Sequence, residues 1–284
     1  MHNMAMKMDV TIYITTKNRA DLLERALISI LEQDYTGKMQ VIIVDDGSDE
    51  NCKEKNKEIV KKIEDKIPIV FIVNEISKGA CYARNLAINR ADGKFITGLD
   101  DDDEFLKSRI SSFINEWDDN LSFLCSDFIN IYKDKTTKQF GNLDSKILSY
   151  KSLLFANFSS NQIFTKTEYL KKIGGFDENV MRLQDWDTWL RLSYKYGHFK
   201  RLPASYIMHH EHEGDRVSRN ISYLQAYKSF VNRNIKLYSL GELLRARLLI
   251  FLLSFPKFSF LSNIISCDLK TLFLMTIKFL LNKV

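Results

Sequence analysis

Four short apolar segments alternate with three helix-like segments in the first hundred residues, and this rhythm restricts the chain to one class of fold. The apolar segments are rich in β-branched residues, as expected of strands buried on both faces. Strands separated by single helices pair in parallel, and the helices cover both faces of the sheet. The sequence therefore predicts an α/β fold. The expected strands are residues 10–15, 39–44, 67–73 and 95–99, and the expected helices are residues 22–31, 53–63 and 80–91.

Two of these expected strands end in carboxylates. Residues 39–44 lead into Asp45 and Asp46, and residues 95–99 lead into four consecutive aspartates, Asp100 to Asp103. Ligands of open α/β sheets bind beyond the carboxyl ends of the strands. Clustered carboxylates need a counter-charge, and their hard oxygen atoms suit Mg²⁺ or Mn²⁺. The alternative is a solvated acidic turn before the next helix, whereas an EF-hand would need a glycine that this stretch lacks.

The pattern is less regular after the acidic run. A polar turn interrupts the apolar residues at 133–138, and a pair of glycines ends a short helical pattern at Gly174-Gly175. Here the sequence predicts a mixture of short strands and helices and no repeated unit. The expected helices are residues 106–117, 167–173 and 186–196, and the expected strands lie within residues 121–132, 163–164 and 199–202.

The last part of the chain, from about residue 221, is helical in pattern, apolar and basic. Between residues 240 and 284 there are six lysines and arginines against two acidic residues. Apolar helical segments flanked by basic residues suit the headgroup region of an anionic leaflet. The alternatives are that these helices pack on the rest of the chain or form the interface of a homodimer.

Composition sets limits on compartment and partner. A chain of 284 residues with 45% hydrophobic residues can form one large domain, or a domain with an appendage. The net charge of +5 suits a phosphate-bearing or anionic lipid partner but does not by itself indicate nucleic-acid binding. The four cysteines lack zinc or redox spacing, as expected of reduced cytosolic thiols. Because no signal peptide or spanning segment is evident, we expect a cytoplasmic protein, peripheral on the inner face of the cell membrane.

Six short motifs lie in order between residues 15 and 187. Together they resemble the inverting nucleotide-sugar glycosyltransferases of family 2. The resemblance covers residues 10–220 and implies the A-type glycosyltransferase fold, with a Rossmann-like nucleotide-binding sheet and a helical C-terminal extension. It implies a catalytic domain over residues 9–220, with a donor half at 9–105 and an acceptor half at 106–220, followed by the extension at 221–284. The motifs are Thr15-Thr16-Lys17-Asn18-Arg19, Val44-Asp45-Asp46-Gly47-Ser48, Ala83-Arg84-Asn85 after Gly79, Gly93 through Asp103, Gly174-Gly175-Phe176-Asp177, and Gln184-Asp185-Trp186-Asp187.

The resemblance assigns the acidic run to a divalent cation. Asp102 and Asp100 would bind Mg²⁺ or Mn²⁺, which neutralises the departing diphosphate, and Asp101 would face the ribose. Because four identical residues follow one another, the resemblance leaves open which of these aspartates takes which role. His210, in a stretch that holds three of the five histidines, would complete the metal shell. A surface histidine in a mobile loop is the alternative.

The resemblance also implies a uridine diphosphate sugar as donor. Thr15 and Asp46 would line the uracil, and Arg84 would lie near the nucleotide. Taken alone, Asp46 would be interpreted as a helix cap or a turn residue, and Arg84 as a solvated helix charge.

Asp185 is the candidate general base, because inversion needs a carboxylate that takes the proton of the acceptor hydroxyl. Asp187 is the fallback, and an N-cap is the structural alternative for Asp185. Gln184 departs from the family, in which glutamate is usual. The resemblance implies an inverting hexosyltransferase that builds a β-linkage on a glycan or a polyprenyl-diphosphate-linked acceptor, as in bacterial O-antigen or capsule synthesis. The alternatives are an inactive nucleotide-sugar-binding or scaffold protein of the same fold and, with less support, a sugar nucleotidyltransferase.

Overall fold

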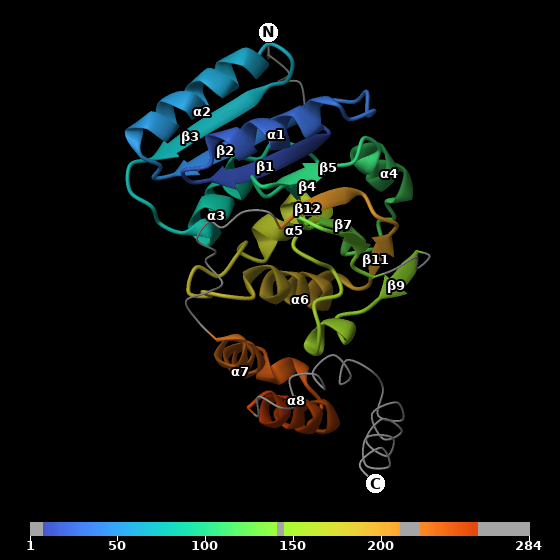
Figure 1. Ribbon diagram of the computed structural model, residues 1–284. Coiled ribbons are helices and arrows are strands. Elements are labelled where there is room, and N and C mark those ends of the chain that lie inside the picture. The colour runs from blue at the N-terminus through green and yellow to red at the C-terminus, as the bar shows by residue number, and fades with distance from the viewer. Residues whose placement is uncertain (1–7, 141–144, 211–221, 255–284) are drawn as a thin grey trace. The chain divides into compact units, whose positions relative to one another are not determined.

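The computed structural model describes residues 8–140, 145–210 and 222–254 (Figure 1). The described chain forms two compact units. One contains residues 8–140, 145–150, 159–180 and 184–210, and the other contains residues 151–158, 181–183 and 222–254. The first unit holds the β-sheets, and the second is helical.

The larger unit is built on the four strands that the sequence predicted. They are parallel neighbours in the order β3-β2-β1-β4. Tyr13 of the first strand lies opposite Ile42 on one side and Gly98 on the other. The central strands are almost entirely buried, which is why their apolar runs are continuous. The bounds are β1 Val10–Thr16, β2 Met39–Asp46, β3 Ile69–Asn74 and β4 Phe95–Gly98.

Three helices connect these strands: α1 (Ala20–Leu31), α2 (Glu50–Ile63) and α3 (Ala80–Arg90). Buried residues of α1 and α2 share one core cluster with alternate residues of β1 and β2. Helix α3 contacts β1 and β2 but contributes no residue to that cluster. In a right-handed crossover, the direction in which the chain moves across the sheet decides which face its helix covers. The chain moves from β1 to β2 and β3 and then returns to β4, so α3 lies on the face opposite α1 and α2 (Figure 1).

Beyond β4 the sheet is mixed. The predicted parallel pairing holds for the first four strands, and one later pair of the same sheet is parallel as well. The next strand, β10 (Ile163–Lys166), is antiparallel to β4. It is followed by β6 (Phe123–Ser126), β11 (Phe199–Leu202) and the edge strand β9 (Lys146–Leu148). Strand β10 therefore pairs residues 164–166 with residues 95–97, which lie far earlier in the chain.

A second, four-stranded sheet has the order β5-β12-β7-β8. Its strand β5 contains Asp103 and Glu104, charged residues that gave no strand signal in the sequence. The remaining helices of this unit lie close to the predicted ranges, although the first begins at Arg109 rather than at residue 106. The strands are β5 Asp103–Phe105, β7 Ile129–Ile131, β8 Thr136–Lys138 and β12 Tyr206–His209, and the helices are α4 Arg109–Glu116, α5 Thr167–Lys172 and α6 Gln184–Tyr196.

The helical unit contains α7 (Tyr223–Arg233) and α8 (Leu240–Leu253), joined through a 3-10 turn at Ile235–Leu237. Helix α8 begins with a capping box between Ser239 and Glu242. A further 3-10 turn at Ser152–Leu154 belongs to this unit, although the boundary expected at residue 221 placed it in the catalytic part. No described helix is long and apolar enough to cross a bilayer, and residues 255–284 of the predicted membrane-binding extension lie outside the described chain.

Candidate functional site

The acidic run lies where β1 and β4 are neighbours at the centre of the larger sheet. The chain leads from β1 to β2 and β3 on one side and returns to β4 on the other. The connections at the carboxyl ends of β1 and β4 therefore diverge, which creates the crevice in which open α/β sheets bind ligands. Asp100 follows Leu99 directly beyond the end of β4.

The four aspartates differ in exposure. Asp101 and Asp103 are buried: Asp101 pairs with Arg19 at 3.2 Å, and Asp103 accepts a hydrogen bond of 2.9 Å from Gln162. The side chains of Asp100 and Asp102 are 31% and 23% exposed. Asp100 and Asp102 are therefore the carboxylates of the run that a ligand can reach.

The run carries more negative charge than its neighbours neutralise. Burial raises the pKa of Asp101 to about 7, although the charge of Arg19 opposes the shift. Burial, together with the charges of Asp100 and Asp102, holds the pKa of Asp103 well above its ordinary value. Such a site favours an added cation, and carboxylate oxygens suit Mg²⁺ or Mn²⁺. Within the described chain no three His, Cys, Asp or Glu side chains are grouped to hold a metal. The partly exposed carboxylates of Asp100 and Asp102 fit an ion that would also be bound by phosphate and water.

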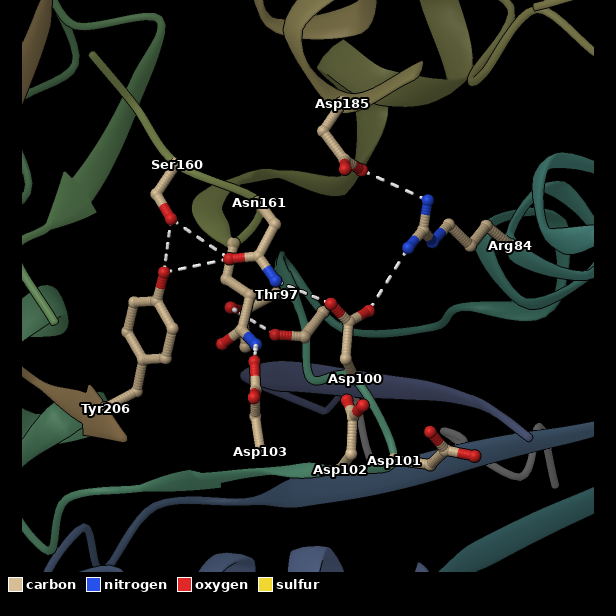
Figure 2. A network of polar contacts seen from close by, with 12 residues as sticks. Arg84, Thr97, Asp100, Asp101, Asp102, Asp103, Ser160, Asn161, Asp185 and Tyr206 are labelled. Atoms are coloured by element: carbon tan, nitrogen blue, oxygen red, sulfur yellow. Dashed lines mark hydrogen bonds and ion pairs between the residues drawn. The ribbon is translucent and has the colours of Figure 1, made fainter. Parts of the chain in front are cut away.

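Arg84 connects the acidic run to the candidate base. Its guanidinium lies 3.1 Å from Asp100 Oδ1 and 3.1 Å from Asp185 Oδ1 (Figure 2). The same group lies 5.1 Å from the ring centre of Phe176. Burial alone would lower the pKa of Arg84, but the charges of Asp185 and Asp100 outweigh it and raise that pKa. Arg84 is thus an ion-pair partner whose side chain is only 11% exposed, and not a solvated helix charge.

Asp185 lies in the first turn of α6, which begins at Gln184, so it is not the N-cap residue. Burial raises the pKa of Asp185 to about 6, with a further increase from Asp100 and an opposing effect from Arg84. A carboxylate with such a pKa can accept a proton near neutral pH. The fallback base, Asp187, is buried and pairs with Arg191 at 3.1 Å within the same helix.

Asn85 connects its own motif, Ala83-Arg84-Asn85, to the motif that begins with the glycines at 174 and 175. Its amide donates to the carbonyl of Phe176 at 2.8 Å and accepts from the Phe176 backbone NH at 2.8 Å. Gly175 has φ +65°, and a Cβ at this position would lie 2.3 Å from Asn85 Oδ1. These contacts hold the Phe176 ring against Arg84, so the separate motifs form one structure.

Asp46 is held by four donors. Its carboxylate accepts from Asn74, Ser77 and the backbone NH groups of Lys78 and Gly79, at 2.8–3.0 Å. Burial alone would raise the pKa of Asp46, but these hydrogen bonds outweigh it and lower that pKa. Asp46 therefore fixes the segment that enters α3.

Asp46 neither caps α2 nor closes the turn that follows β2, because Asp49 caps that helix and Asp45 accepts from the Ser48 NH of the turn. Binding of uracil by Asp46 remains a prediction, and it would require one of the present donors to move away. Thr15 lies at the end of β1, partly exposed, opposite Val44.

His210 is not brought together with Asp100 and Asp102 as a group of metal ligands. Its Nε2 lies 2.7 Å from Asn130 Oδ1, and its ring stacks on Tyr132 with centres 4.3 Å apart. Its neighbour His209 contacts the acidic stretch instead, through Glu104 at 2.5 Å. The metal role of His210 therefore remains a prediction, and the rest of the histidine stretch, from residue 211 on, lies outside the described residues.

Sequence reasoning missed Arg19, Asn161, Gln162 and Tyr206, all of which contact the acidic run or its partners. Arg19 stands within the first motif and could have been proposed as the counter-charge. Asn161 and Gln162 lie directly before β10, and only the pairing of β10 with β4 brings them to the aspartates.

Comparisons with known proteins agree with this architecture. The family model described as Glycosyl transferase family 2 matches residues 11–179. The putative colanic acid biosynthesis glycosyl transferase WcaA of Escherichia coli (strain K12) is 32% identical over 234 residues, which is 79% of this chain and 81% of that protein. The GalNAc(5)-diNAcBac-PP-undecaprenol beta-1,3-glucosyltransferase of Campylobacter jejuni is 29% identical over 164 residues, 56% of this chain and 52% of that protein.

Among solved structures, S. aureus TarS 1-349 in complex with UDP-GlcNAc has a TM-score of 0.66 at 18% identity, covering 79% of this chain and 66% of that one. At this identity the likeness concerns the fold alone. The predicted fold class, an α/β Rossmann-like sheet of the A-type fold with helices in the C-terminal part, is confirmed.

Proposed function

Because this chain belongs to glycosyl transferase family 2, we propose that it moves a hexose from a uridine diphosphate donor to a glycan or lipid-linked oligosaccharide, with inversion to a β-linkage. The observation that carries the proposal is the Arg84 bridge. One guanidinium holds the candidate base Asp185 and the candidate cation ligand Asp100, each at 3.1 Å. An inverting transfer needs such a pair, one group for the incoming alcohol and one for the leaving diphosphate.

Each side chain of the site has a separate task in this proposal. Asp185 accepts the proton of the acceptor hydroxyl as its oxygen attacks the anomeric carbon and the bond to the diphosphate breaks. Arg84 orients Asp185 and adds positive charge beside the leaving group. A divalent cation held by Asp100 and Asp102 would supply further charge neutralisation there. Thr15 and Asp46 are proposed for the uracil, and Asp101 for the ribose.

The donor and acceptor classes have support from the relatives. The TarS structure contains UDP-GlcNAc, and the Campylobacter jejuni relative is named for an undecaprenol-linked acceptor. The name of WcaA refers to colanic acid biosynthesis. We propose by analogy that this chain acts in bacterial surface-polysaccharide synthesis on a glycan or a polyprenyl-diphosphate-linked acceptor.

Two other functions are alternatives to the proposed sugar transfer. Gln184, where glutamate is usual in the family, is compatible with a protein that binds nucleotide sugar without turnover. A nucleotidyltransferase has less support, because Lys17-Asn18-Arg19 after β1 contains no glycine with which to cradle phosphates.

The donor class can be tested by thermal denaturation with a panel of nucleotide sugars. UDP-sugars are expected to raise the Tm by about 5–10 °C at a hundredfold excess over Kd, because a ligand that binds only the folded state stabilises it. The shift should require Mn²⁺ or Mg²⁺ and disappear with EDTA. Stabilisation by GDP- or ADP-sugars, with none by UDP-sugars, would refute the uridine assignment.

Helix α8 is proposed as the contact with an anionic membrane surface. Leu240, Leu244 and Leu248 recur every four residues, so they share one face of the helix, and they are 77%, 58% and 43% exposed. Ala246 and Leu249 are buried elsewhere on the helix. The described part of the helical unit has one acidic residue, Glu242, against seven basic residues: Lys151, Arg182, Lys228, Arg233, Lys236, Arg245 and Arg247. An apolar ridge in a basic unit suits anionic lipid headgroups.

Replacing Leu240, Leu244 and Leu248 together by glutamine is expected to weaken partitioning into phosphatidylglycerol vesicles by about 10-fold to 100-fold, because apolar contact with the acyl region is lost. Vesicle co-sedimentation at two salt concentrations measures this, and salt should weaken binding of the unaltered protein. The control is Ile147→Gln, at a 63% exposed position on β9. Equal partitioning of the triple variant, combined with loss of a dimer in analytical ultracentrifugation, would identify the ridge as a subunit interface instead.

A further inference from the structure

The segment Ser160-Asn161-Gln162, directly before β10, holds the acidic run from one side. The Asn161 amide Nδ2 donates to Asp100 Oδ2 at 2.5 Å, and Gln162 Nε2 donates to Asp103 Oδ2 at 2.9 Å. The carbonyl of Ser160 accepts from the indole NH of Trp189 at 3.0 Å. Trp189 belongs to α6, the helix that carries Asp185, so this segment connects the base helix to the aspartates.

The orientation of the Asn161 amide is determined by two hydroxyl groups. Its Oδ1 lies 2.8 Å from Tyr206 Oη and 3.0 Å from Ser160 Oγ (Figure 2). The two hydroxyls also contact each other, and one of them donates in that contact. Each hydroxyl has a single proton, so the other hydroxyl is left to donate to the amide oxygen. The NH₂ group is therefore turned toward Asp100.

Tyr206 is a rigid support for this amide. It is fully buried on β12, and its ring stacks on Phe128 with centres 5.0 Å apart. The guanidinium of Arg109 lies 5.2 Å from the ring centre. Burial, with a contribution from the charge of Asp103, raises the pKa of Tyr206 well above its usual value. The hydroxyl therefore keeps its proton and acts as a donor.

The turn that carries Asn161 is itself constrained. Ser160 has φ +64°, a left-handed conformation that serine seldom adopts. Its contacts with Trp189 and Tyr206 offset this cost. Strained residues of this kind persist where the surrounding structure over-determines them, and they cluster at functional sites.

We propose that Asn161 is a positioning residue for the divalent cation, an inference that rests on the proposed metal-dependent transfer. Asp100 uses one oxygen for Arg84 and the other for Asn161. With both contacts in place the carboxylate of Asp100 cannot rotate freely, so its orientation is fixed before a cation binds. Tyr206 acts on the cation only through Asn161. Hydrogen bonds that orient metal-binding carboxylates commonly contribute 10-fold to 100-fold to metal affinity.

Binding of Mn²⁺ in the presence of UDP, followed by the EPR signal of free Mn²⁺ and corrected for Mn²⁺ bound by UDP alone, tests this inference without turnover. Asn161→Ala is expected to weaken Mn²⁺ binding by about 10-fold to 100-fold, and Tyr206→Phe by a smaller factor. Tyr196→Phe is the matched control, because within the described chain the Tyr196 hydroxyl has no hydrogen-bond partner. It should bind Mn²⁺ as the unaltered protein does.

The double variant separates positioning from general damage to the fold. If Tyr206 acts through Asn161, adding Tyr206→Phe to Asn161→Ala should weaken Mn²⁺ binding no further. Additive losses would overturn the proposed route, and unchanged Mn²⁺ binding in both single variants would overturn the inference. Failure of the unaltered protein to bind Mn²⁺ with UDP would instead overturn the metal dependence of the proposed function. Should Asn161→Ala not fold, Tyr206→Phe, which removes a single oxygen, still decides the question.

Discussion

Asp185→Asn is expected to lower kcat by about 100-fold to 10,000-fold while leaving UDP affinity unchanged. Asparagine keeps the size of the side chain and an oxygen for Arg84, which now lies 3.1 Å from Asp185, but it cannot accept a proton from the acceptor. General base catalysis contributes a rate factor of that size. Product formation from labelled UDP-sugar measures the loss, and equilibrium dialysis with UDP measures binding.

The matched control is Asp187→Asn, the same substitution two residues further along α6. Asp187 is buried and paired with Arg191 at 3.1 Å. Its replacement should lower the free energy of unfolding and the yield of folded protein, with little effect on kcat of the folded fraction. Unchanged product formation in Asp185→Asn would reject Asp185 as the base. A kcat loss confined to Asp187→Asn would transfer that role to Asp187.

The same assignment predicts how the rate depends on pH. Burial raises the pKa of Asp185 to about 6, and a base acts only in its deprotonated form. Below that pH the fraction of competent enzyme, and with it kcat/KM, should fall by about tenfold per unit. The residual activity of Asp185→Asn should lack this acid limb.

Asp102→Asn is expected to lower transfer by about 100-fold or more, because charge neutralisation by a bound cation is worth several kcal/mol at a leaving diphosphate. Asp102 is one of the two carboxylates of the run that a ligand can reach. The loss should accompany weaker Mn²⁺ binding with UDP, which distinguishes it from damage to the acceptor site.

Asp101→Asn provides the comparison that decides which aspartate of the run binds the cation. Asp101 is buried and faces Arg19 at 3.2 Å, so its replacement should affect stability more than Mn²⁺ affinity. If Asp101→Asn abolished Mn²⁺ binding and Asp102→Asn did not, the cation would be bound one residue earlier than proposed.

The first half of the fold could be predicted because its signals are local. The apolar runs that became β1, β2 and β4 began within a residue of their predicted starts, and Asp100 to Asp103 lie beyond a buried strand as expected. Strand β5 could not be predicted, because Asp103-Glu104-Phe105 has no alternating pattern and pairs with β12 a hundred residues later. Asn161 could not be predicted as a site residue either, because only the long-range pairing of β10 with β4 brings it to Asp100.

The sequence by itself determined the fold class, the family and the place of the acidic run, since strand periodicity and short motifs depend on neighbouring residues. Only the tertiary structure decided which aspartates are reachable, because the fold buries Asp101 and Asp103 and leaves Asp100 and Asp102 partly exposed, although Arg19 contacts both Asp101 and Asp102. It also decided that Arg84 bridges Asp100 and Asp185 and that Asn161 holds Asp100. These contacts join segments far apart in the chain, so no local pattern encodes them.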